Sequence, residues 1–465
     1  MRDAPPPPLA AEAEPLSHGL KQRHLTMLGL GGVIGAGLFV GSGAGISVAG
    51  PGIVLSYLIS GTIAMLVMRM LGEMSSAMPA SGSFSVHAER ALGRWAGFSV
   101  GWLYWFLLVV VLAVEATGAA GIAHGWVPAV PQWGWVLVFM VAFTVANLAA
   151  VKNFGEFEFW FAALKVGAIV LFLALGTLAI FGLLPDTEPV GLTHLTGDGG
   201  FLPNGWSGVV SGVLVVVFAF GGLEVVTIAA AETEDPAHAV GRAVRSAVVR
   251  ILFFYVGSML VIVTVLPWTA QKAGLSPYVA VLDSIGVPSA GRIMEIVIFV
   301  ALLSALNANL YGSSRMVFSL AERGEAPKGL LKVTGGGVPR RAVLASVAFG
   351  FVSVLLNLRW PDSVFLYMLN SVGAVLLFVW AFIAVAQLRL RRRLEREAPE
   401  LLTLRMWAFP WLTWAALVAM AAVLVLMLTD AQARPQVLWS GGATALVLLV
   451  SAGREMRTRR HRVVG

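Results

Sequence analysis

The sequence of 465 residues contains no cysteine, and only 12% of its residues are charged. A chain without thiols forms no disulfide, no iron–sulfur cluster and no thiolate metal site, and it has no cysteine nucleophile. Average soluble domains carry about 25% charged residues. Hydrophobic residues make up 58% of this chain. So few charges cannot cover a surface that faces water, so the composition predicts a protein that crosses a lipid bilayer many times.

Apolar runs of the length that spans a bilayer, about 20 residues, recur along the chain. Together they predict an all-α membrane protein with twelve transmembrane helices. The expected spans are residues 26–48, 52–78, 96–124, 132–151, 157–183, 206–231, 244–267, 291–319, 341–358, 362–388, 407–428 and 437–453.

Lysine and arginine are distributed unevenly between alternate loops. If the amino terminus lies inside, 27 of the 32 fall in inner segments, 4 in outer loops, and Lys165 lies within a span. Cytoplasmic loops carry such an excess. The pattern predicts a multi-pass protein of the plasma or inner membrane with both termini in the cytoplasm. It also explains the net charge of +7 and the RLRRRLER run without nucleic-acid binding.

The ends of the chain differ from its middle. Residues 1–20 contain four consecutive prolines and no apolar core, which is typical of a disordered cytoplasmic tail and not of a signal peptide. Residues 21–455 form the expected transmembrane domain, and residues 456–465 form a basic cytoplasmic tail.

Two spans are poor continuous helices. The first reads LGLGGVIGAGLFVGSGAG, and the sixth contains Gly221 and Gly222 followed by Glu224. Glycine weakens a helix interior, although small residues also allow close helix packing. The two segments lie five spans apart, at matching positions of two halves, and an odd number of spans makes the second half inverted. Interrupted helices at matching positions indicate a transporter's binding site.

The interruptions also predict the ligand. Unwinding at residues 34–37 frees N–H groups that attract a carboxylate, whereas unwinding at residues 218–222 frees carbonyls that accept an ammonium group. Non-helical backbone at this depth must line a cavity. We therefore expect an amino-acid site, with a site for ions alone as the alternative. The expected binding residues are Ile34, Gly35, Ala36, Gly37, Phe218, Ala219, Phe220, Gly221, Gly222 and Glu224.

Three ionisable residues, Glu115, Lys165 and Glu224, lie well within spans. Burying a charge there is costly, so each is a candidate for proton coupling. Lys165 could instead extend to the membrane interface. Glu224 could bind the ammonium group or carry the proton, and Glu115 could be a neutral core acid. Arg69 and Glu73, four residues apart, are expected to form a structural pair.

Several segments resemble the amino-acid permeases of the amino acid–polyamine–organocation superfamily, and among them the 4-aminobutyrate (GABA) permeases. They are RHLTMLGLGGVIGAGLFVGSG, MRMLGEM, GRWAGFSVGWLYWF, GEFEFW, GGFLPNG and EVVTIAAAETEDP. The resemblance implies an inverted five-plus-five repeat, with halves at about 25–183 and 206–388 and two extra helices at about 407–453. It also implies proton-driven uptake, rocking of spans 1, 2, 6 and 7, and a Lys165 ammonium where sodium-coupled relatives bind sodium.

The expected function is therefore import of an amino acid, GABA or a similar small zwitterion, by proton symport with alternating access. The alternatives are a permease for alanine, glycine, proline or aromatic amino acids, an exchanger, or a passive channel. An enzyme is not expected, because no paired catalytic groups gather at one membrane face. No Walker motif or metal-ligand spacing of histidines occurs, so we expect no cofactor and no metal. The expected partners are the substrate, protons and lipid, with no obligate protein partner.

Overall fold

The structure, a computed structural model, describes residues 33–80, 83–149, 154–185, 189–224, 227, 236–271, 275–332, 339–361, 363–429 and 434–464. Every regular element in these ranges is a helix, as the composition and the apolar runs predict. Residues 1–20, expected to be a tail, lie outside the described ranges. The backbone of the basic segment after residue 455 continues the last helix to Val464.

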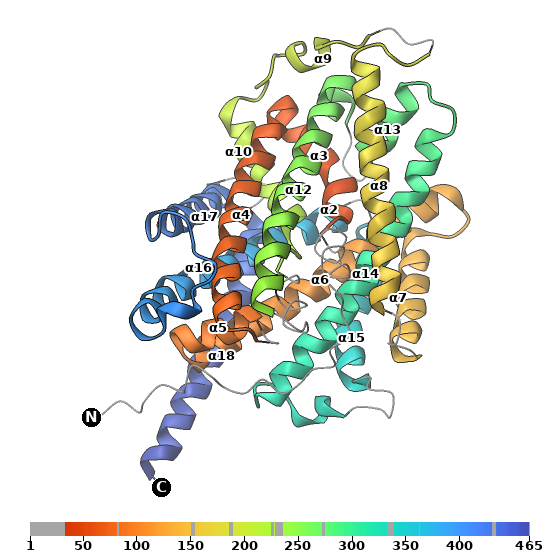
Figure 1. The fold of residues 1–465 in the computed structure, drawn as a ribbon. Coiled ribbons are helices and arrows are strands. Elements are labelled where there is room, and N and C mark those ends of the chain that lie inside the picture. The colour runs from red at the N-terminus through yellow and green to blue at the C-terminus, as the bar shows by residue number, and fades with distance from the viewer. Residues whose placement is uncertain are drawn as a thin grey trace.

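Each of the twelve expected spans overlaps a helix of the structure (Figure 1). The membrane helices are α2 (Ala36–Phe39), α3 (Gly41–Ala49), α4 (Ile53–Ala77), α6 (Arg94–Trp126), α7 (Gln132–Ala149), α8 (Phe154–Ile180), α10 (Gly205–Val216), α12 (Pro236–Val265), α14 (Ala290–Glu322), α15 (Arg340–Arg359), α16 (Val364–Glu397), α17 (Trp411–Thr429) and α18 (Arg434–Val464). The connections contain α5 (Ser83–Leu92), α9 (Thr193–Thr196), α13 (Pro277–Ser284) and 3-10 turns: η1 (Gly50–Gly52), η2 (Val217–Phe220), η3 (Trp268–Ala270), η4 (Lys328–Leu331) and η5 (Pro399–Leu401).

Eight segments in the described ranges are long and apolar enough to cross a membrane, and three shorter apolar helices accompany them. One of the eight, Ala36–Ala77, consists of α2, α3, η1 and α4. The chain reverses direction within it, at η1, where Gly50 has a positive φ of 60° (Figure 1). Glycine adopts this backbone conformation without strain. The segment therefore contains parts of two separate membrane spans, which meet at η1, as the sequence predicts.

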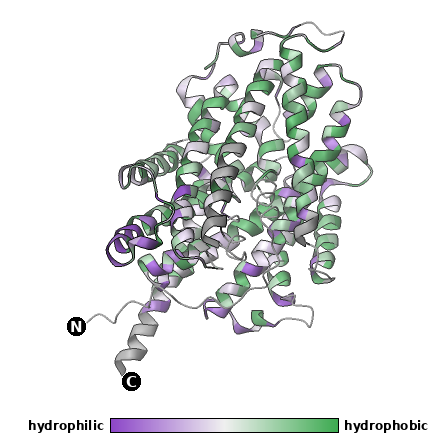
Figure 2. Ribbon diagram, in the orientation of Figure 1, coloured by the Kyte–Doolittle hydropathy of each residue, from purple (hydrophilic) through white to green (hydrophobic). Residues whose placement is uncertain are grey.

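A long helix, α6, lies at the centre of the bundle. It packs against α14, α16 and α15, while α4 packs against α12 and α3 against α10. The helices are hydrophobic along most of their length, and hydrophilic residues gather at the end of α16 (Figure 2). This end contains the RLRRRLER run, which extends α16 to Glu397, beyond the expected boundary at residue 388.

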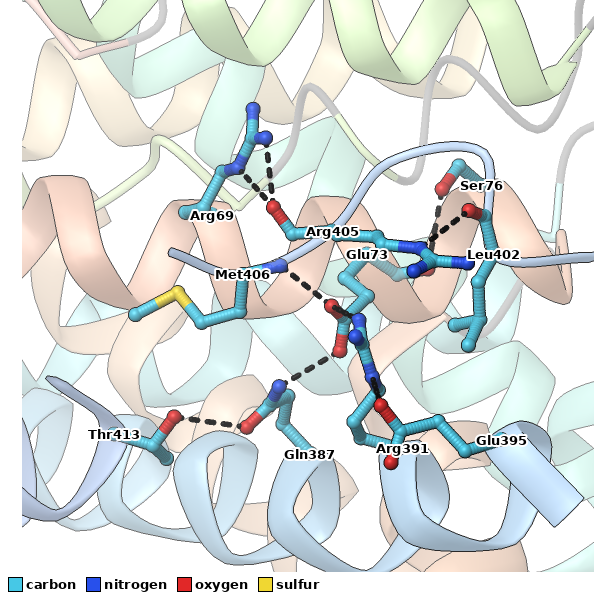
Figure 3. Close-up of polar contacts among 10 residues, drawn as sticks. All are labelled: Arg69, Glu73, Ser76, Gln387, Arg391, Glu395, Leu402, Arg405, Met406 and Thr413. Atoms are coloured by element: carbon cyan, nitrogen blue, oxygen red, sulfur yellow. Dashed lines mark hydrogen bonds and ion pairs between the residues drawn. The ribbon is translucent and has the colours of Figure 1, made fainter. Parts of the chain in front are cut away.

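A buried carboxylate, Glu73, joins α4 to the last helices at the end of the molecule that carries α5 (Figure 3). It forms an ion pair with Arg391 of α16 and accepts a hydrogen bond from the Met406 backbone N–H. The Gln387 amide donates to its other oxygen at 2.7 Å and accepts a hydrogen bond from Thr413 of α17. The carboxylate therefore faces three donors, all of them from the carboxy-terminal third.

The partner of Glu73 differs from the one that the sequence predicts. Arg69, four residues earlier, donates two hydrogen bonds to the Arg405 carbonyl, at 2.9 and 2.7 Å, and lies over the Trp407 ring (Figure 3). The expectation of an Arg69–Glu73 pair considered one helix surface only. The tertiary fold brings the Arg391 guanidinium to Glu73 from a helix more than 300 residues away.

We expect Glu73→Gln to destabilise the protein markedly. Removing the Glu73 charge leaves the buried Arg391 guanidinium with Glu395, which is 45% exposed, and breaking a buried pair costs about 3–5 kcal/mol. The matched control is Glu397→Gln, which removes the i, i+4 partner of Arg393 at a site where Glu397 is 46% exposed. Such an exposed pair contributes about 0.3–0.5 kcal/mol. Thermal unfolding of both variants in detergent measures the difference, and equal small shifts would contradict the role of the Glu73 cluster.

Candidate functional site

The first interruption lies immediately before α2. Residues Val33–Gly35 are not helical, and Gly35 precedes the first helical residue with φ −149° and ψ −147°. The sequence predicted that the unwound stretch would reach Gly37, but Ala36 and Gly37 are already in the helix. Residues before 33, which would form the inner half of this span, lie outside the described ranges.

A carboxylate occupies the start of α2, and it belongs to the protein. The Ala36 backbone N–H donates to both oxygens of Glu115, each at 3.1 Å. Glu115 extends from the centre of α6 and is 3% exposed. A Cβ atom on Gly35 would lie 2.5 Å from Glu115 Oε1, so a side chain there would collide with this carboxylate. The sequence predicted that a substrate carboxylate would bind at this position. In the structure, the Glu115 carboxylate occupies the position.

The second interruption follows α10. The helix tightens into η2 over Val217–Phe220, after which Gly221 is extended and Gly222 has φ +100°. A β-carbon is strained at this φ, which explains the glycine. The Gly221 N–H donates to the Phe218 carbonyl at 2.9 Å. Beyond Glu224 only residue 227 is described before 236, so the inner half of this span is not described.

A tyrosine that sequence reasoning missed connects the two interruptions. The Tyr255 hydroxyl of α12 lies 3.1 Å from the Val33 carbonyl and 2.9 Å from the Ala219 carbonyl. Tyr255 is completely buried, and its ring packs against Phe220. A buried tyrosine hydroxyl requires a hydrogen-bond partner, so a tyrosine within an apolar span was the available signal. The carbonyls freed at both interruptions therefore face one donor.

A narrow cavity lies between the interruptions. Only about 20 Å³ of it admits the centre of a water molecule, which is room for about one water. Of the predicted residues, it is lined by Gly37, Glu115, Phe218, Ala219, Gly221 and Gly222. The wall also contains residues that the sequence did not single out: Val33, Leu107, Leu108, Val111 and Asn309. The predicted residues outside the wall are Ile34, Gly35, Ala36, Phe220, Glu224 and Lys165.

Glu224 is buried beside the cavity, behind Gly222. Its carboxylate accepts hydrogen bonds from the Trp380 indole N–H, from the Gly222 N–H at 2.9 Å and from the Tyr104 hydroxyl at 3.5 Å. These donors come from α16, from the interruption itself and from α6. In this conformation the carboxylate therefore holds the interruption in place, and it does not face the cavity.

Lys165 of α8 is fully buried and does not extend to the protein surface. Its ammonium nitrogen forms an ion pair with Glu158 at 3.9 Å. The Ser304 hydroxyl of α14 lies 3.1 and 3.0 Å from the two oxygens of the same carboxylate. Lys165 also interacts electrostatically with Glu115. The structure thus pairs Lys165 with Glu158, and Glu115 is a second charge in the neighbourhood of the lysine.

The contact of Tyr255 with the two carbonyls predicts that two similar substitutions have different effects on the stability of the protein. Tyr255→Phe removes a hydroxyl that bonds the protein and should destabilise it by about 1 kcal/mol. The control is Tyr57→Phe, in the same aromatic cluster, with ring centroids 5.9 Å apart. The Tyr57 hydroxyl is buried without a hydrogen-bond partner in the described part of the chain. Its removal should leave stability unchanged or raise it.

Thermal unfolding of both phenylalanine variants in detergent provides the comparison. Equal destabilisation would mean that the Tyr57 hydroxyl is also hydrogen-bonded, through water, and that Tyr255 has no special part in holding the interruptions.

Comparison with known proteins identifies the family of the chain. The sequence profile of the family described as Amino acid permease matches residues 24–452. The chain is 48% identical to the gamma-aminobutyric acid permease of Bacillus subtilis over 93% of its length and 92% of that protein. It is 50% identical to an aromatic amino acid transport protein of Corynebacterium glutamicum, over 92% and 93%, and 48% identical to a probable GABA permease of Pseudomonas aeruginosa, over 93% and 91%.

The fold is similar to that of a solved transporter. The crystal structure of the Eremococcus coleocola manganese transporter, in complex with an aromatic bis-isothiourea substituted compound, superposes with a TM-score of 0.54, over 95% of each chain. The sequences are only 14% identical, so this similarity concerns the fold alone. The profile match and the identity to the curated permeases extend over nearly the whole chain. This multi-pass membrane protein therefore belongs to the amino acid permease family.

Proposed function

We propose that the protein imports GABA or a similar small zwitterion by proton symport with alternating access. Two relatives at 48% identity are a GABA permease and a probable GABA permease, which supports this substrate class. The proposal includes twelve spans with both termini in the cytoplasm, an inverted five-plus-five repeat and two additional helices. The overlap of each expected span with a helix supports that count.

The observation that carries the proposal is the cavity between the two interruptions. The Ala36 N–H of the first interruption binds a carboxylate, and one carbonyl from each interruption, Val33 and Ala219, faces a donor. These are the groups that recognise the two charged ends of an amino acid. The cavity is too small for one in this conformation, so the interruptions must separate when substrate enters. A Cβ on Gly37 would lie 2.8 Å from Ala219 Cα, which reflects how closely they approach.

The Glu115 carboxylate offers a physical reason for coupling to a proton. A substrate carboxylate that binds the Ala36 N–H must displace Glu115 or share the site with it. Two carboxylates in one buried site cannot both remain ionised without a large cost. The cost is lowest if a proton arrives with the substrate, or if the displaced Glu115 pairs with Lys165. We propose that a proton passes between Glu115 and Lys165 during transport, while Glu158 positions the Lys165 ammonium group.

A second candidate is an aromatic amino acid as substrate. The Corynebacterium relative, an aromatic amino acid transport protein, is 50% identical and supports this alternative as much as the others support GABA. Part of the cavity wall is apolar, with Leu107, Leu108 and Val111, and could contact the side chain of such a substrate. The substrate must therefore be determined by competition.

The experiment is uptake into proteoliposomes that contain the purified protein. We expect labelled GABA to accumulate when the outside is acidified, and accumulation to disappear when a protonophore collapses the gradient. Unlabelled GABA should compete better than phenylalanine or tryptophan. Competition by the aromatic amino acids alone would select the second candidate. Downhill flux that neither saturates nor responds to the pH gradient would indicate a channel and refute both.

The proposed role of Lys165 predicts that Lys165→Arg loses accumulation against a gradient. Arginine keeps the charge and the ion pair with Glu158, but it does not release its proton in a protein. Exchange of internal for external substrate needs no net proton movement and should survive. If Lys165 serves only as the structural partner of Glu158, arginine should support full accumulation.

The companion variant is Glu115→Gln, which keeps a hydrogen-bond acceptor for the Ala36 N–H but cannot titrate. It should reproduce the phenotype of Lys165→Arg, with exchange present and proton-driven accumulation lost. Gradient-driven uptake and exchange are measured on the same reconstituted preparation. Full accumulation by both variants would exclude this pair from the coupling step.

A further inference from the structure

A second hollow, separate from the cavity, lies where the first residues of α15 meet the loop that contains η4. It is an open groove of about 400 Å³. Its floor consists of Trp102 and Trp105 of α6, Val317 of α14 and Ala345 of α15, and its rim consists of Pro327, Gly329, Leu330 and Arg341. Nothing in the transport scheme uses this groove.

The walls of the groove are apolar because their polar atoms are bonded elsewhere. The Trp102 indole N–H donates to the Glu325 carbonyl at 3.2 Å, and the Trp105 indole N–H donates to the Ser346 hydroxyl at 3.0 Å. The two rings lie edge to face, with centroids 5.3 Å apart. The groove therefore offers hydrocarbon and ring surface to a ligand, which excludes a zwitterion from its depth.

Positive charge lies along the rim. One N–H of the Arg341 guanidinium donates to the Gly329 carbonyl at 3.3 Å. A guanidinium has five N–H groups, so others remain for a ligand. Lys328 stands between two rim residues and Arg340 precedes Arg341, and all three cationic residues are exposed. The nearby Glu325 is buried and lies 3.3 Å from Arg323, which compensates its charge.

The position of the groove along α15 indicates which part of the bilayer its opening faces. Arg341 is the second residue of α15, whose apolar run follows directly. Tryptophan and arginine at the end of a span mark the boundary between lipid head groups and hydrocarbon. In the orientation proposed above, this boundary faces the cytoplasm, where anionic lipids bind basic pockets between helices.

We propose that this groove binds an anionic phospholipid of the cytoplasmic leaflet. One acyl chain lies along Trp102, Trp105 and Ala345, and the lipid phosphate contacts Arg341. The bound lipid joins α6, α14 and α15 at one end, and these helices also contribute Glu115 and Asn309 to the cavity and Ser304 to the ion-pair group. The inference rests on the proposed orientation but not on the identity of the transported amino acid.

The test uses the purified full chain in neutral detergent, with phosphatidylglycerol or phosphatidylcholine of identical acyl chains added. Native mass spectrometry counts bound lipid, and thermal unfolding measures stabilisation. We expect phosphatidylglycerol to bind about tenfold more tightly than phosphatidylcholine, which is the effect of a charge-assisted contact of ordinary strength. Equal binding of the two lipids, or the same stabilisation by inorganic phosphate alone, would overturn the proposal.

Two pairs of variants locate the site. Ala345→Trp fills the groove without changing charge, and its control is Leu344→Trp, at the neighbouring residue, which is 52% exposed and outside the groove. Arg341→Gln removes the phosphate contact, and its control is Arg359→Gln at the opposite end of α15. Ala345→Trp should lose bound lipid, Arg341→Gln should lose the preference for phosphatidylglycerol, and both controls should behave as wild type.

If Ala345→Trp does not fold, Leu330→Ser in η4 weakens the apolar rim at a partly exposed turn and should reduce lipid binding in the same way. Wild-type lipid binding by the folded groove variants would overturn the inference. Because lipid binding is measured without transport, its failure is distinguishable from a failure of the proposed transport function.

Discussion

Backbone groups that leave a helix inside a membrane must find partners within the protein, because lipid offers none. Here the partners include three side chains, one of which is Glu224, whose carboxylate accepts from the Gly222 N–H. The Glu115 carboxylate accepts from the Ala36 N–H, and the Tyr255 hydroxyl faces the Val33 and Ala219 carbonyls. With these partners, two interrupted helices are stable in the middle of an apolar bundle. The narrow cavity lies between two interruptions whose freed groups are satisfied in this way.

Under the proposed function, the same contacts suit the interruptions to an amino acid. A substrate that brings its own carboxylate and ammonium group replaces partners that the protein already supplies. Such an exchange conserves the number of satisfied backbone groups, so the cost of opening the site stays moderate. The buried neighbours of Glu115 then decide what happens to its displaced charge. Lys165 is near enough to interact with it, and Lys165 in turn pairs with Glu158, whose carboxylate accepts a hydrogen bond from Ser304.

Away from the cavity, the bundle is fixed by polar clusters where helices end. Glu73 collects donors from α16, α17 and the connection between them, which ties α4 to the carboxy-terminal third (Figure 3). The mouth of the apolar groove lies at the corresponding end of α6, α14 and α15.

The sequence by itself determined the helical class, the approximate bounds of the spans and the two places where helices are interrupted. Each of these follows from local properties: hydrophobic runs of sufficient length, and glycines that weaken a helix. It also singled out Glu115, Lys165 and Glu224, because a charge within an apolar run is conspicuous without knowledge of the fold.

Only the tertiary structure decided which of these groups meet. The Arg69–Glu73 expectation was wrong because the guanidinium that binds Glu73 comes from Arg391, and sequence spacing does not report on a contact across more than 300 residues. Tyr255 was missed because a tyrosine in an apolar span signals only that its hydroxyl needs a partner, and the two carbonyls that it meets come from other helices. Glu115 occupies the predicted carboxylate position because α6 crosses the start of α2, and that crossing is a property of helix packing alone.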